Sequence, residues 1–109
     1  VTPIAAALII ADKSDVRRSR VRPAEREQAV TTNAPPADIH DRVNYAVESS
    51  SLAFSDDKKE LILTLKIDLH ISSVMEYFEI FLSRMSLCRT AASSLGVNFG
   101  LVINNSRIL

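Results

Sequence analysis

Residues 73–96 decide the fold, and they read SVMEYFEIFLSRMSLCRTAASSLG. Ser73 and Glu76 match a capping box, in which the hydroxyl accepts from one free backbone N–H and the carboxylate accepts from another. The apolar positions that follow recur at steps of four and three, the spacing of one helix face. They are Val74, Phe78, Phe81, Met85, Cys88, Ala92 and Leu95. With Gly96 as the left-handed residue after the last turn, the stretch predicts one helix of about 22 residues, roughly 33 Å long.

Alternating apolar residues on both sides of this helix predict three strands. The first strand is expected at Val43, Tyr45 and Val47, and it continues through Leu52 and Phe54 after a bulge. A polar turn then joins it to a second strand in a β-hairpin, and a third strand follows the helix. The alternating positions of the second and third strands are Leu61, Leu63, Leu65 and Ile67, and Val97, Phe99, Leu101 and Ile103.

These elements predict an α+β fold, with a β-β-α-β module over residues 42–109. In this module the long helix covers one face of a three-stranded sheet. A right-handed crossover would make the third strand parallel to the second, and we place the first strand between them, in the order 2-1-3. Tyr77, Ile80, Leu82 and Leu87 lie off the main helix stripe. We expect them to make a second contact, either with an N-terminal helix or with another subunit.

The N-terminal residues 1–22 are expected to form a helix with an apolar front and a basic rear. Thr2 suits the cap of this helix and Pro3 its first position. Ile4, Leu8 and Ala11 share one face at helical spacing. Asp12 falls on the same side, so we expect it at the end of a buried stripe.

Residues 23–41 contain three of the four prolines, several charges and few large apolar groups. We interpret them as a linker or long loop with one short helical turn at residues 24–29. Within it, residues 38–41, Asp-Ile-His-Asp, are expected to be a polar lead-in to the first strand.

The composition is that of one small domain. The chain has 109 residues, and its 13 Lys and Arg balance its 13 Asp and Glu, so the net charge favours neither nucleic acid nor an acidic surface as partner. The longest apolar run, residues 4–11, is too short to span a membrane, and we expect no membrane contact. Cys88 is the only cysteine, which excludes an intramolecular disulfide and favours the cytoplasm.

The sharpest motif for chemistry is Leu-Ile-Ile-Ala-Asp-Lys at residues 8–13. An apolar helix that ends in a carboxylate suits the binding of a metal ion, with Asp12 as ligand. The neighbouring cations Lys13, Arg17 and Arg18 would then hold phosphate oxygens. The alternative is an ordinary helix that ends in a solvated turn of mixed charge.

The string Ile-Ile-Ala-Asp-Lys at residues 9–13 resembles the last conserved segment of the HD-domain metal-dependent phosphohydrolases. The resemblance covers about residues 3–22, and it implies that residues 1–22 are the incomplete, terminal part of an all-helical HD-like domain. In that family a His and a His-Asp pair precede the final Asp, which Asp12 matches. The eleven residues before Asp12 contain no His. We therefore expect a C-terminal fragment that is inactive alone. The resemblance implies a divalent metal ion and a phosphorylated small molecule for the intact protein.

The pair His40-Asp41 follows Asp12 instead of preceding it, which is the wrong order for this family. A rival hypothesis brings His40 and Asp41 to Asp12 in space, as three metal ligands with an open position. His70 is expected in the turn before the long helix, with a role as ligand or base as its alternative. Cys88 lies on the helix stripe and is expected in the core.

The module of residues 42–109 would serve dimerisation or regulation, and we expect a homodimer. Two other functions compete with the hydrolase: a non-enzymatic interaction or dimerisation module, and a small-ligand sensor. The sensor rests on fold analogy, because helix-on-sheet folds often bind ligands between their layers. No aromatic residue is interleaved with the basic residues 13–22, so we expect a phosphate ligand there before nucleic acid.

Overall fold

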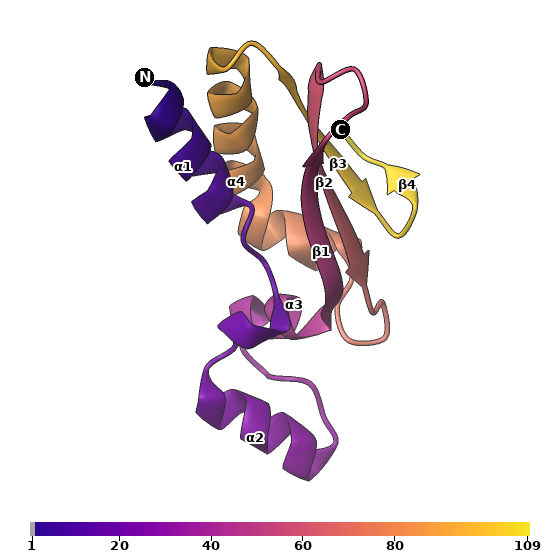
Figure 1. Ribbon diagram of the computed structural model, residues 1–109. Helices are drawn as coiled ribbons and strands as arrows, with labels where there is room; N and C mark the ends of the chain where they lie inside the picture. The colour runs from indigo at the N-terminus through magenta and orange to yellow at the C-terminus, as the bar shows by residue number, and fades with distance from the viewer. Residues whose placement is uncertain (1) are drawn as a thin grey trace.

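The computed structural model describes residues 2–109 and has the expected α+β class (Figure 1). The helices are α1 Pro3–Lys13, a short 3₁₀ helix η1 Arg18–Arg20, α2 Pro23–Thr32, α3 Ile39–Ala46 and α4 Val74–Ser94. The strands are β1 Val47–Phe54, β2 Glu60–Ile67, β3 Asn98–Ile103 and β4 Ser106–Arg107. The short β4 makes the sheet four-stranded, where we expected three strands.

The sheet has the order β1-β2-β3-β4. Strand β3 is parallel to β2, as predicted, and pairs with it from Glu60↔Asn98 to Leu65↔Ile103. The predicted order 2-1-3 is wrong, because β2 lies between β1 and β3. The reason is burial: every second residue of β2 is buried, whereas β1 is exposed after Val47. The more apolar strand takes the centre of the sheet, and the serine-rich strand takes the edge.

Helix α3 occupies the place where we expected the start of the first strand and its polar lead-in. Asp38 caps this helix by accepting a hydrogen bond from the backbone N–H of Asp41, at 3.2 Å. Val43 and Ala46 are buried, and Ile39 packs against the same core. Their spacing of four and three is that of a helix. The strand that we predicted from the alternation at residues 43–47 is therefore wrong for residues 43–46, which belong to α3. The strand has a bulge, as expected, but it lies between Val47 and Ser49, just before the serine run of residues 49–51 where we expected it.

Helix α2 takes up half of the stretch that we interpreted as a linker or loop with one turn. Pro23 occupies its first turn, and Asn33, with a φ of 54°, ends it in the left-handed region. Ala29 is its buried residue. In Figure 1 this helix lies at the far end of the molecule from the sheet's β2–β3 layer.

Helix α4 confirms the central prediction. The Ser73 hydroxyl accepts from the backbone N–H of Glu76 at 3.1 Å, which is half of the expected capping box. The other half does not form, because the Glu76 carboxylate accepts from Arg42 and from the Ser72 hydroxyl instead. This carboxylate therefore ties α4 to α3.

The core lies on both sides of α4. The helix packs against the sheet on one side and against α1 on the other (Figure 1), so the second contact that we expected for it is with the N-terminal helix. Tyr77 belongs to the core, whereas Leu82 and Leu87 remain exposed. Cys88 is buried, as predicted. Within residues 2–109, no helix has the length and apolar character needed to cross a membrane.

Candidate functional site

Helix α1 presents to solvent the face that we expected to be buried. Its buried residues are Ala6 and Ile10, the latter 2% exposed, whereas Ile4 lies outside and Leu8 is 65% exposed. All residues from 4 to 11 are apolar, so the hydrophobic pattern alone does not choose the inner face. The consequence is that Asp12 lies on the outer surface, where its side chain is 65% exposed and 3.1 Å from Lys13 Nζ.

Asp12, His40 and Asp41 are not brought together. Asp41 Oδ2 accepts from Arg22 Nε at 2.9 Å and from Nη2 at 2.6 Å, so this nearly buried carboxylate holds the start of α2 against α3. His40 is exposed in the first turn of α3. Residues 2–109 contain no group of three or more His, Cys, Asp or Glu that could hold a metal ion.

The cations that we assigned to phosphate have partners within the chain. Arg17 Nε lies 3.0 Å from Asp15 Oδ1. Arg18 Nε donates to the Tyr45 carbonyl oxygen at 2.8 Å, and its guanidinium lies 4.3 Å from the centre of the Tyr45 ring. The Arg18 contacts fix the segment after α1 to α3, and the Arg17 ion pair lies within that segment, so both contacts have a structural role.

The outer edge of β1 is a candidate site that our sequence analysis missed. Strand β1 ends the sheet, and all its residues after Val47 are exposed. Its only charged residue, Glu48, lies at the bulge and pairs with Lys66 at 3.4 Å. The run of three serines at residues 49–51 was the available sequence signal of an edge strand.

The hydrogen-bonding pattern identifies which backbone groups of β1 face outward. The N–H of Ser55 donates to the Glu60 carbonyl oxygen at 2.9 Å. Bonded and non-bonded pairs alternate along an antiparallel ladder. In the observed register, Ser51 and Ala53 therefore bond to β2. The residues that alternate with them, Ser50, Leu52 and Phe54, turn their N–H and C=O groups toward solvent.

The side chains of these outward-facing residues extend the apolar face of the sheet. Leu52 pairs with Leu63 and Phe54 pairs with Leu61, and paired residues of an antiparallel ladder share a face. Leu61 and Leu63 are buried in the core against α4. Leu52 and Phe54 are 40% and 55% exposed, because the helix does not reach as far as β1.

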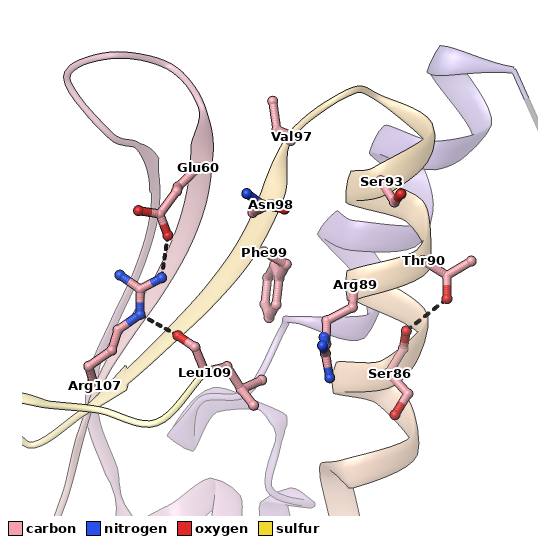
Figure 2. A pocket seen from close by; sticks show the side chains of 10 residues that line it. All are labelled: Glu60, Ser86, Arg89, Thr90, Ser93, Val97, Asn98, Phe99, Arg107 and Leu109. Carbon is pink, nitrogen blue, oxygen red and sulfur yellow. Dashed lines mark hydrogen bonds and ion pairs between the residues drawn. The ribbon is translucent and has the colours of Figure 1, made fainter.

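A cavity of about 810 Å³ forms a second candidate site, bounded by α4, β3 and the C-terminal segment (Figure 2). Phe99, Val97 and Leu109 supply its apolar surface, and Arg89 reaches it from α4. On its other side, Arg107 binds the Glu60 carboxylate and the Leu109 carbonyl oxygen. The sequence signal for this site was weak: Ser86, Arg89 and Ser93 form a polar face of α4 beside the apolar stripe.

Comparison with known proteins gave no match: no family model, no curated protein and no solved structure matches this chain. The resemblance of residues 3–22 to HD-domain phosphohydrolases therefore stays a prediction. Its test is whether the reading frame upstream of Val1 encodes a His and a His-Asp pair.

Proposed function

We propose that this chain is a non-enzymatic interaction module that forms a homodimer through antiparallel pairing of two β1 strands. The observation that carries the proposal is the open edge of β1, where Ser50, Leu52 and Phe54 turn their backbone groups outward beside exposed apolar side chains. An interaction module was one of the functions expected from the sequence.

The composition of the edge supports pairing with another strand. Edge strands are commonly protected from such pairing by Lys, Pro, inward-pointing charges or a covering segment. Residues 49–54 contain no charge and no proline. The bulge and Glu48 protect only the beginning of β1 from pairing with another strand.

A second copy of the chain fits this edge, because the edge is self-complementary. With a two-fold axis at Leu52, that residue lies opposite Leu52 of the second copy, and Phe54 lies opposite the small Ser50. Each outward-facing residue then donates one hydrogen bond and accepts another. The axis leaves both α4 helices on the same face of one continuous sheet. An axis at Ser51 would pair Phe54 with Glu48, at the bulge, so we favour the axis at Leu52.

The size of the contact sets the expected affinity. A stable interface buries about 1,600 Å², and one short strand pair with two apolar side chains per copy buries less. We expect a dissociation constant in the micromolar range, for which about 1 μM corresponds to about −8.2 kcal/mol.

Sedimentation equilibrium of the chain over a wide range of concentration tests the proposal. Leu52→Lys places two like charges opposite each other at the two-fold axis, which destabilises a strand pair, and we expect a monomer. The matched control is Thr64→Lys, because Thr64 is exposed on the central strand β2 and should leave the dimer intact. A wild-type chain that stays monomeric at the highest concentrations, or a Leu52→Lys variant that dimerises like wild type, would contradict the proposal.

A further inference from the structure

The cavity beside α4 lies apart from the β1 edge, on the β3 and β4 side of the sheet. Its volume of about 810 Å³ falls in the range of small-molecule sites, about 300–1,000 Å³. The dimer proposed above makes no use of it.

The charges around the cavity favour an anion. Glu60 and Arg107 bind each other, so their charges largely cancel. Arg89 makes no ion pair and no side-chain hydrogen bond with any of residues 2–109. One unpaired guanidinium is therefore available, and this group binds carboxylate and sulfonate-like oxygens in a fork. A single cation suits a singly charged anion better than a phosphate dianion.

The remaining surface of the cavity favours a ligand with an apolar body. Phe99 is almost fully buried, and its ring lies between Arg89 and the Glu60–Arg107 pair in Figure 2. Val97 and Leu109 are half-buried beside it. Ser86 and Ser93 lie one turn to either side of Arg89 on the same face of α4, so their hydroxyls add hydrogen-bonding groups near the cation.

From this juxtaposition we infer that the cavity is a binding site for a small organic monoanion with an aromatic or aliphatic ring. The anionic group binds Arg89 and the neighbouring serine hydroxyls. The ring packs on Phe99, Val97 and Leu109. The Glu60–Arg107 pair forms the opposite wall and holds the C-terminal segment in place.

A pair of probes tests the inference on the full chain: 1-anilinonaphthalene-8-sulfonate and its uncharged analogue N-phenyl-1-naphthylamine, which has the same rings. The sulfonate should bind one to one by calorimetry and fluorescence. Arg89→Gln should weaken its binding about tenfold or more, since a charge-assisted hydrogen bond is lost, and should leave binding of the uncharged analogue within about twofold. The control is Arg26→Gln, which removes the same charge from the half-buried Arg26 of α2, away from the cavity.

A second variant fills the cavity. Ser93→Trp should abolish binding of both probes while circular dichroism shows an unchanged fold, because Ser93 is exposed and faces the cavity from α4. The inference is overturned if the sulfonate shows no saturable binding up to about 1 mM, or if it binds Arg89→Gln or Ser93→Trp as it binds wild type. Unchanged binding to either variant would assign the probe to another apolar surface, such as the β1 edge.

Discussion

Replacing Ile10 by alanine, beside the matched change Leu8→Ala, tests which face of α1 packs against α4. The two residues are isomers on one helix, but Ile10 is 2% exposed and Leu8 is 65% exposed. Removal of a fully buried Ile side chain costs about 2–5 kcal/mol, and removal of a mainly exposed one costs within about 0.5 kcal/mol. Both changes introduce alanine, so the difference in helix propensity between them is small.

Urea unfolding followed by far-ultraviolet circular dichroism measures this difference, because the chain has no Trp. With a slope of about 2 kcal/mol per M for a small protein, Ile10→Ala should lower the midpoint by about 1–2.5 M. Leu8→Ala should leave the midpoint within about 0.3 M of wild type. A Leu8→Ala variant that loses as much stability as Ile10→Ala would refute the orientation of α1 and return Asp12 to the buried side of the helix.

Three further predictions concern pH, metal ions and the edge strand. The hydrogen bond from Arg42 lowers the pKa of Glu76 below its ordinary 4.5. The ionised Glu76 therefore stabilises the folded chain fully above about pH 4.5, and this stabilisation is lost as the pH falls through the lowered pKa. Glu76→Gln should accordingly flatten the fall in urea midpoint between about pH 5 and 3. Calorimetry should detect no saturable binding of Mn²⁺ or Zn²⁺ by this chain, whereas tight binding that His40→Ala removes would support the Asp12, His40 and Asp41 site. Leu52→Pro should leave the monomer folded, because the lost N–H points outward. Ser51→Pro removes an N–H that bonds to β2, and it should lower the free energy of unfolding by about 3 kcal/mol or more. Equal urea midpoints for the two variants would show that the outward-facing groups are wrongly assigned.

The parts of the fold that could be predicted from the sequence are those with long, unambiguous periods. The apolar stripe from Val74 to Leu95 has the spacing of one helix face. The alternation from Leu61 to Ile67 fits only a strand. The parallel pairing of the second and third strands followed from the handedness of crossovers.

The parts that could not be predicted have patterns with two physical solutions. Val43 and Val47 fit an alternating strand, but Ile39, Val43 and Ala46 fit a helix equally well, and tertiary packing selects the helix. In α1 every residue from 4 to 11 is apolar, so no single face is marked as the inner one. Asp38, a good cap directly before Ile39, was the signal that favoured the helix.

The candidate sites were less predictable than the fold because they depend on which elements become neighbours. Arg18 and Asp41 looked like ligands in the sequence, but in the structure they bind Tyr45 and Arg22. Conversely, Leu52 resembles an ordinary core residue of a strand. Only the place of β1 at the edge of the sheet exposes it.

Disulfide trapping at Leu52 tests the central claim most directly. Residues related by the proposed axis form a bonded pair with Cα atoms about 5.5 Å apart, within the range of a disulfide. Burial raises the pKa of Cys88 to about 11, so the native thiol should not react. Under mild oxidation at micromolar concentration, Leu52→Cys should form a covalent dimer rapidly. Thr64→Cys, on the central strand, should form no covalent dimer, although its chains still associate. Equal rates of cross-linking for the two variants would contradict dimerisation through β1.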